Sequence, residues 1–240
     1  MPSFKYRSYQ KELLDRDDIP FEDIKRNMQE LDLINRKLGG HSITIDGCIK
    51  LMTGIKPVSI LNVTEIGCGG GDNMRAIMQW AKNKNIRINL TGIDINSECI
   101  AYAQQHPANE GMKFIRSDYR DVVFEKKPDI CFSSLFCHHF SEDELVFMLI
   151  WMQQNSSLGF FINDLHRHPL AWHSIRLLTR LFSKSYLFKN DAPLSVQRGF
   201  KKNEWTEAFN SAGISSFSCE WRWAFRWLVT CRPNATETGI

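Results

Sequence analysis

The sequence predicts an α/β fold, in which helices cover a doubly wound, mostly parallel β-sheet that ends in an antiparallel hairpin. Three observations support this fold class. Short apolar runs alternate with stretches of helical periodicity, a glycine-rich turn follows the first run, and the end of the chain is almost continuously strand-like. Parallel strands need helical crossovers, whereas two strands without a helix between them must be antiparallel neighbours.

The predicted strands and helices follow one another in order along the chain. The strands are expected at 61–66, 88–93, 113–115, 129–133 and 158–162. Helical stretches begin at Asp72 and cover 97–105 and 142–152. An earlier helix starts after Pro20 and should end at Gly39 and Gly40. We therefore expect an N-terminal helical cap over residues 1–50 and a core over residues 51–240.

The last forty residues have a different pattern. A helix is expected over 203–212, closed by Gly213, and 214–232 then reads as strand with aromatic residues on one parity. No Asn-Gly or Asp-Gly marks a turn, and we place it near 223–226.

A long segment separates the fifth strand from this part of the chain. Pro169 can start a helix that is apolar on more than one face, and we expect a helical lid insertion at about 169–200. Such a helix usually has two partners. One would be the body of the fold, and the other could be the N-terminal helix, a second subunit or an apolar substrate.

Composition indicates what kind of partner the protein binds and in which cellular compartment it lies. Lys and Arg number 30 against 27 Asp and Glu, so nucleic acid is neither demanded nor excluded and a small molecule is the default partner. The seven cysteines form no CxxC pair and read as buried reduced thiols. Neither a secretory signal nor a stretch of membrane-spanning length is evident, so we expect a cytoplasmic protein without a transmembrane segment.

The glycine-rich turn is the strongest motif. It reads "EIGCGGG" from Glu65 to Gly71, and the dinucleotide fingerprint G-x-G-x-x-G would need glycine where Asp72 stands. Nicotinamide binding is therefore disfavoured. A second acid, Asp94 in "LTGIDIN", follows the next strand.

With the acid first, the glycines at alternate positions and Asp94 after the second strand, the sequence resembles the class I S-adenosylmethionine-dependent methyltransferases over about residues 60–232. The resemblance implies a three-layer, seven-stranded sheet and S-adenosyl-L-methionine as cofactor. It implies that Glu65 faces the methionine moiety, that Asp94 accepts the ribose hydroxyls, and that Asp118 takes the adenine amino group. The implied cofactor contacts are Glu65, Gly67, Cys68, Gly69, Gly71, Asp94, Ile95, Asp118, Tyr119 and Leu135. Alternatively, Asp94 could be a helix N-cap and Asp118 a loop acid.

Histidines follow the fourth and fifth strands. In "SSLFCHHFSEDEL", Ser141 and Glu144 form a capping box, so His138 and His139 precede the helix in a loop that lines the methyl-transfer site of the resembled family. One of the two could merely pack or bond to the backbone. After the fifth strand, "NDLHRH" adds His166 and His168.

Methyl transfer is an in-line displacement that needs no metal, and we expect none. A phenolic acceptor would need a general base, for which His138, His139 and His166 are the candidates. A carboxylate acceptor would need none, and Arg167 or Arg198 would hold it with His168 nearby. The four histidines favour oxygen on a phenol, so we expect methyl transfer to a small apolar or aromatic acceptor.

The segment 163–200 also resembles a subgroup of bacterial small-molecule methyltransferases from polyketide and aryl-polyene pigment pathways. Two other functions stay open. A methyltransferase-like binding or partner subunit is disfavoured by the intact Glu65, glycines and Asp94. A nucleic-acid methyltransferase is disfavoured by the low net charge and by Ser134 to Cys137, which stand where an Asn/Asp-Pro-Pro-aromatic tetrapeptide would be. The sequence does not decide whether the protein is a homodimer.

Overall fold

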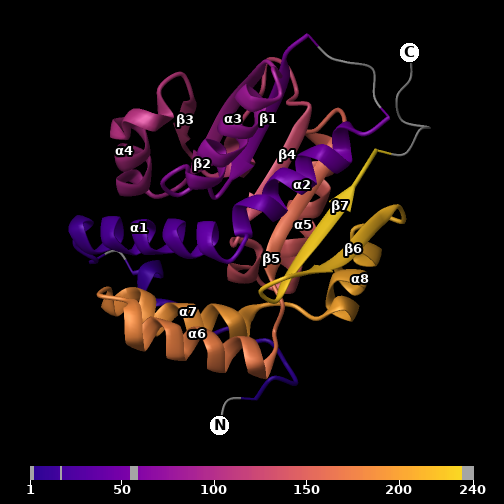
Figure 1. Ribbon diagram of the computed structural model, residues 1–240. Helices are drawn as coiled ribbons and strands as arrows, with labels where there is room; N and C mark the ends of the chain where they lie inside the picture. The colour runs from indigo at the N-terminus through magenta and orange to yellow at the C-terminus, as the bar shows by residue number, and fades with distance from the viewer. Residues whose placement is uncertain (1–2, 17, 55–58, 234–240) are drawn as a thin grey trace.

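The computed structural model describes residues 3–16, 18–54 and 59–233, and it confirms the predicted fold (Figure 1). A seven-stranded sheet has the order β3-β2-β1-β4-β5-β7-β6. The first five strands are parallel, and β7 runs antiparallel to both of its neighbours. The strands are β1 (Leu61–Ile66), β2 (Ile88–Asp94), β3 (Lys113–Arg116), β4 (Ile130–Ser134), β5 (Gly159–Leu165), β6 (Phe217–Arg222) and β7 (Arg226–Cys231).

Helices cover both faces of the sheet. On one face, residues of α2, α3 and α4 form a buried cluster with β1, β2 and β4. On the other face, α5 and α8 form a second cluster with β4, β5 and β7. The helices are α1 (Phe21–Lys37), α2 (Gly40–Met52), α3 (Asp72–Asn83), α4 (Ser97–Gln105), α5 (Glu142–Gln154), α6 (Pro169–Phe182), α7 (Tyr186–Arg198) and α8 (Lys202–Ser211).

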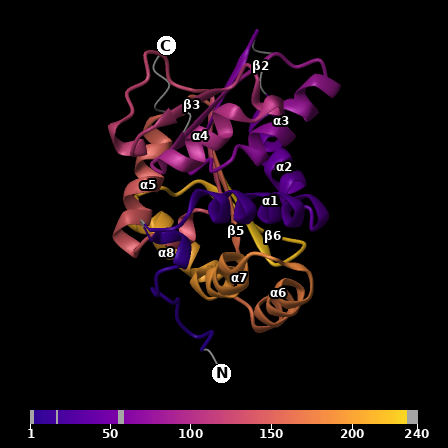
Figure 2. The same cartoon turned by 90° about the vertical axis from the view of Figure 1, so that its left-hand side faces the viewer.

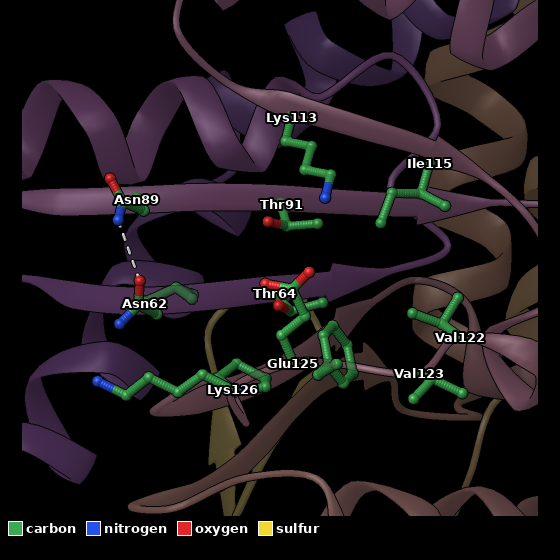
Figure 3. A pocket seen from close by; sticks show the side chains of 13 residues that line it. Asn62, Thr64, Asn89, Thr91, Lys113, Ile115, Val122, Val123, Glu125 and Lys126 are labelled. Atoms are coloured by element: carbon green, nitrogen blue, oxygen red, sulfur yellow. Dashed lines mark hydrogen bonds between the residues drawn. The ribbon is translucent and has the colours of Figure 1, made fainter.

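One part of the second face lacks a helix. Only a short 3₁₀ turn, Tyr119–Asp121, lies between β3 and β4, and the rest of that connection is loop. A hollow of about 360 Å³ therefore lies over β1, β2 and β3, and Figure 3 shows the polar side chains of Asn62, Thr64, Asn89 and Thr91 facing it. Polar side chains on this face suit a surface that water can reach.

Helix α2 was not predicted as a separate element. The prediction that the first helix ends near Gly39 and Gly40 is confirmed, but Gly39 then takes a left-handed φ of +81° and a second helix begins at once. Helix α2 packs on β5, where a Cβ at Gly47 would lie 2.4 Å from the ring of Phe161. Glycine at this position lets the helix approach the sheet closely.

The insertion between β5 and α8 is a pair of helices. The predicted helix from Pro169 is α6, and it packs on α7, which contains Pro193 in its interior. Helix α1 contacts both α7 and α4, and Figures 1 and 2 show it between the helix pair and the glycine-turn half of the molecule. Among the described residues, none of the helices has the length and hydropathy needed to cross a bilayer.

Candidate active site

Three adjoining cavities lie along the carboxyl edge of the sheet. The first, of about 430 Å³, lies between the ends of β2 and β3 and the start of α5. The second, of about 90 Å³, covers the glycine turn and shares Gly67 with the first. The third, of about 140 Å³, lies under α1 and α7 and shares Leu31 and Leu135 with the second. The shared residues make one path along the edge where open α/β sheets bind ligands.

The glycine turn has the backbone that its residues predict. Gly67, Gly69 and Gly71 have φ values of +70°, +49° and +74°, which side chains rarely tolerate. A Cβ at Gly67 would lie 2.5 Å from the ring of Phe136, whereas a Cβ at Gly69 would meet nothing within 4 Å. The turn thus packs closely at its first glycine and leaves open space at the second. Leu135, opposite it, also has a left-handed φ, of +53°.

The two acids of the motif lie beside this turn. Asp94 accepts hydrogen bonds from Gly69 N (2.9 Å) and Asn96 N (2.9 Å), and burial raises its pKa. Asn96 is the N-cap of α4, which removes the alternative that Asp94 serves as that cap. Glu65 is buried and accepts from Asn73 Nδ2 at 3.0 Å through Oε1. Its Oε2 has no hydrogen-bond partner in the described part of the chain, and burial raises its pKa well above the usual range.

Of the ten predicted cofactor contacts, all but Glu65 and Gly71 line the three cavities. Ile95 is 68% exposed and, with Asp118 and Tyr119, lines the first cavity. Asp118 accepts from Arg120 N at 3.0 Å and pairs with the Arg120 side chain, whose hydrogen bond lowers its pKa. Contact of Asp118 with adenine stays a prediction. Cys68 lines the second cavity.

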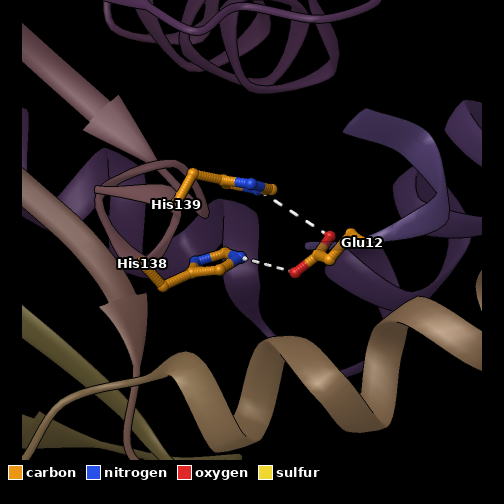
Figure 4. A group of neighbouring side chains, drawn as sticks. All are labelled: Glu12, His138 and His139. Carbon is orange, nitrogen blue, oxygen red and sulfur yellow. Dashed lines mark ion pairs between the residues drawn. The ribbon is translucent and has the colours of Figure 1, made fainter. Parts of the chain in front are cut away.

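A cluster of two histidines and three carboxylates lies at the third cavity, and we call it the His–carboxylate cluster. His138 Nδ1 lies 2.8 Å from Asp164 Oδ1, and its Nε2 lies 3.6 Å from Glu12 Oε1. His139 Nδ1 lies 3.3 Å from Asp15 Oδ1, and its Nε2 lies 3.8 Å from Glu12 Oε2. Figure 4 shows both rings turned toward Glu12.

The two histidines differ in their suitability as a base. Burial alone would lower the pKa of His138, but the carboxylates of Asp164 and Glu12 outweigh it and raise the pKa to about 9. His138 is therefore an imidazolium at neutral pH and has no free lone pair to accept a proton. His139 is the more accessible ring, with 22% of its side chain exposed, and it lines the third cavity. The structure thus favours His139 over His138 as the base.

Two buried arginines, Arg7 and Arg198, support the histidine loop through hydrogen bonds to its backbone. Arg198 donates to the carbonyl oxygens of His138 (3.1 Å) and His139 (3.0 Å), and Arg7 donates to that of Phe140 (2.8 Å). Arg198 was expected to hold a carboxylate acceptor. The structure corrects this expectation, because its guanidinium is directed at backbone carbonyls and does not line the three cavities.

The residues after β5 also lie away from the cavities. Arg167 is buried and donates to Glu204 Oε2 at 3.0 Å and to the Gly199 carbonyl. Its guanidinium is therefore occupied within the protein and does not hold a carboxylate substrate. His166 packs against Trp227 with ring centroids 4.9 Å apart, and burial lowers its pKa to about 4. His168 accepts from Leu170 N at 3.1 Å as the N-cap of α6. The structure does not bring these three residues to His139.

Sequence reasoning missed several residues of the site, among them Glu12, Asp15, Asp164 and Arg226. Glu12 belongs to the N-terminal segment, residues 3–16, and accepts from Ser195 Oγ at 2.7 Å. Asp164 lies in β5, where its place at the carboxyl end of a strand was an available signal. Arg226 is buried, lines the third cavity and donates to Asn35 Oδ1 at 2.7 Å, and burial lowers its pKa to about 10. Neither Glu12 nor Arg226 had a sequence signal.

Comparison with known proteins supports the class of protein that the glycine-rich motif predicted. Residues 63–154 match the family described as methyltransferase domain. Over 118 residues the chain is 25% identical to the mitochondrial ubiquinone biosynthesis O-methyltransferase of Saccharomyces cerevisiae, a match that covers 47% of this chain and 36% of that protein. The chain thus spans about a third of the length of this curated relative.

Solved methyltransferases share the fold. Human N-acetylserotonin methyltransferase in complex with SAM aligns with a TM-score of 0.61 at 17% identity, over 94% of this chain and 63% of that one. The plantazolicin methyltransferase BpumL in complex with SAH aligns with a TM-score of 0.60 at 15% identity, over 88% of this chain and 99% of that one. The architecture is the Rossmann-like methyltransferase fold. The domain match over residues 63–154 and the shared fold support the class that the motif predicted, the class I S-adenosylmethionine-dependent methyltransferases.

Proposed function

We propose that this protein transfers the methyl group of S-adenosylmethionine to the phenolic oxygen of a small apolar acceptor. The observation that supports it most directly is the junction of the cavities at Leu135. There the path over the glycine turn meets a separate cavity with the His139 imidazole on its wall. A methyl donor on one side and a proton acceptor on the other are what such a reaction needs.

The residues of the first two cavities fit the methyl donor. It carries a cationic ammonium and a ribose but no phosphate, so acids suit it better than a cradle of amide donors. Glu65 lines neither cavity but is hydrogen-bonded to Asn73 of the second, and its unpartnered Oε2 suits the ammonium. The carboxylate of Asp94, in the first cavity, suits the ribose hydroxyls. The exposed Ile95 offers an apolar surface for the adenine ring.

The third cavity fits an apolar ring with one polar end. Most of its wall is aliphatic or aromatic, and its polar side chains include His139, Arg226 and Asp191. The apolar residues that line it are Leu14, Leu31, Ile34, Leu135, Leu165, Ile175, Phe188, Ala192 and Val196.

The His–carboxylate cluster can carry the proton of the acceptor. With its Nδ1 facing Asp15, His139 would hold its own proton there and accept the phenolic proton at Nε2, where the imidazolium then formed would face Glu12 Oε2 at 3.8 Å. The oxygen then attacks the methyl carbon as the carbon–sulfur bond breaks, which leaves S-adenosylhomocysteine. The charges on Arg226 and His138 favour the developing phenolate.

Mass spectrometry with isotopically labelled S-adenosylmethionine tests the proposal. The purified protein would be incubated with panels of phenols, carboxylic acids and tRNA, and transfer of the label to a phenol is expected. Labelled carboxylic acids or tRNA alone would overturn the phenolic assignment. Calorimetric binding of the cofactor without transfer to any class would favour the binding-subunit alternative.

Replacing Asp94 by alanine should weaken cofactor binding by about 2 to 4 kcal/mol. The substitution removes the carboxylate that would accept from the ribose hydroxyls. It also removes the hydrogen bond from Gly69 N, which orders the turn. Isothermal titration calorimetry measures the change. The exposed Asp46, on α2, supplies the control Asp46→Asn, which should bind as the parent does. Equal affinity in the parent and Asp94→Ala would remove Asp94 from the site.

The helices that cover the third cavity should become more protected on binding. Asn27, Leu31 and Ile34 of α1 and Phe188 and Val196 of α7 line the cavity, so we expect these helices to open and close around an acceptor. Hydrogen exchange followed by mass spectrometry should show faster exchange in both helices without ligand and slower exchange with S-adenosylhomocysteine. Exchange that is already slow and unchanged by the ligand would contradict a gating role.

A further inference from the structure

Helix α6 presents an apolar stripe to the outside of the molecule. Leu170, Leu177 and Leu181 fall on one line along the helix and are 61%, 59% and 65% exposed, and Phe182 beside them is 77% exposed. Figures 1 and 2 both show α6 as an outermost helix, at the edge away from β3 and α4. Its opposite side packs inward through Trp172, toward Phe4 and α7. The second apolar side of the predicted two-sided helix therefore faces outward.

The surroundings of the stripe are basic. Between His166 and Asn190 the sequence has five Lys or Arg residues and no Asp or Glu, and of the five only Arg167 is buried. A hollow of about 270 Å³ between α6 and α7 is lined by Arg176, Arg180 and Lys189, and none of the described residues around it is acidic. At the far end of α6, Glu30 contacts the chain, and its carboxylate accepts from Lys184 N at 2.8 Å.

We propose that α6 docks on the surface of an anionic lipid bilayer. The leucine stripe and Phe182 would enter the headgroup region, and Arg176, Arg180 and Lys189 would bind lipid phosphates in and around the hollow. An apolar stripe flanked by cations is the pattern of helices that lie in the interfacial plane. Each cation near an anionic surface adds to the affinity, and salt screens this contribution.

Charge favours a bilayer over a second copy of the chain as the occupant of this face. A twofold contact through α6 would place the same basic patch of two copies together. No acid between His166 and Asn190 could pair with those cations, and like charges across an interface oppose association. An anionic lipid surface supplies the complementary charge.

The position of α6 also suggests what membrane docking would do for the reaction, an argument that rests on the proposed function. Ile175 of α6 and Phe188 and Val196 of α7 line the third cavity, so the same pair of helices faces both the acceptor and the outside. An apolar acceptor dissolved in a bilayer would then be close to the helices that cover its cavity. The docking itself does not depend on this step.

Vesicle flotation with the full chain tests the docking without any acceptor. The parent should bind vesicles of phosphatidylcholine mixed with phosphatidylglycerol, bind pure phosphatidylcholine weakly, and release from the mixture at high salt. The double variant Leu177→Glu/Leu181→Glu should partition at least about tenfold less. The control Ile49→Glu changes an exposed aliphatic residue on α2 and should bind as the parent does.

A second variant keeps the test valid if the first fails to fold. Arg180→Gln/Lys189→Gln retains the apolar stripe and should partition about 30-fold less, with a weaker dependence on salt. Circular dichroism and calorimetric cofactor binding should remain those of the parent for each variant. Failure of the parent to bind the mixed vesicles at low salt would overturn the proposal. A dimer in lipid-free solution that the Leu177→Glu/Leu181→Glu variant abolishes would assign the stripe to a second copy instead.

Discussion

Replacing His139 by glutamine is expected to lower turnover by about 10²- to 10⁴-fold while cofactor affinity stays unchanged. Glutamine can still hydrogen-bond, but it cannot take the phenolic proton. The ring borders the third cavity and not the glycine turn, so binding of the methyl donor should not depend on it. Steady-state kinetics on the true acceptor and calorimetry with S-adenosylhomocysteine measure the two effects separately.

The pH profile separates base catalysis from positioning in this variant. A phenol has a pKa near 10, so the remaining activity of His139→Gln should rise with pH as the acceptor ionises by itself. His173→Gln changes an exposed histidine on α6 and should keep the parental rate and profile. If His139→Gln also kept them, His139 would not be the base, and a carboxylate acceptor that needs no base would become the better assignment.

Replacing Asp164 by asparagine is expected to lower the free energy of unfolding by about 3 to 5 kcal/mol, because the buried imidazolium of His138 loses its nearest counter-charge. Only Glu12, 3.6 Å from Nε2, would then remain beside it. Asp164 also accepts from His138 N at 3.2 Å and Leu165 N at 2.7 Å, so the loop loses support as well. Urea denaturation measures the change, and the exposed Asp46→Asn should stay within about 0.5 kcal/mol of the parent.

The same ion pairs set a dependence of stability on pH. The pKa of His138 rises from its ordinary 6.5 to about 9 in the folded protein, so its contribution is complete below 6.5 and is lost as the pH rises through 9. The carboxylates that pair with it are Asp164 and Glu12, and both have lowered pKa values and stay ionised in this range. The free energy of unfolding of the parent should therefore fall between these pH values more steeply than that of His138→Gln. Parallel slopes in the two proteins would contradict the charged state of His138.

The parts of the fold that sequence reasoning predicted well are those in which local pattern and tertiary packing agree. The strands β4 and β5 begin with continuous apolar runs because both of their faces are buried, whereas β1 and β2 alternate apolar and polar residues because one face borders the open hollow. The cofactor turn was predictable because only glycine readily adopts the backbone of Gly67, Gly69 and Gly71. His138 and His139 could be placed because the strand before them and the capping box after them fix the loop.

The parts that could not be predicted depend on contacts that no local pattern records. Helix α7 was not predicted as a separate helix because Pro193 in its interior reads as a helix breaker. The final hairpin turn lies where it was predicted, near 223–226, but the left-handed backbone of Ala224 and Phe225 could not be foreseen, because neither residue signals a turn. Glu12 lies in a polar stretch without periodicity, and its role depends on Ser195 and on two histidines far along the chain.

The ribosome makes the N-terminal segment long before it makes the residues that this segment contacts. Leu13 N donates to Asp191 across 178 positions of sequence, and Arg7 donates to the Arg198 carbonyl across 191. The bond between Gly69 N and Asp94 spans only 25 positions. Contacts at short sequence separation form sooner than distant ones, and a growing chain folds from its beginning. The glycine turn and its bond to Asp94 can therefore form before α7 is made, whereas the third cavity must wait for α7 to leave the ribosome.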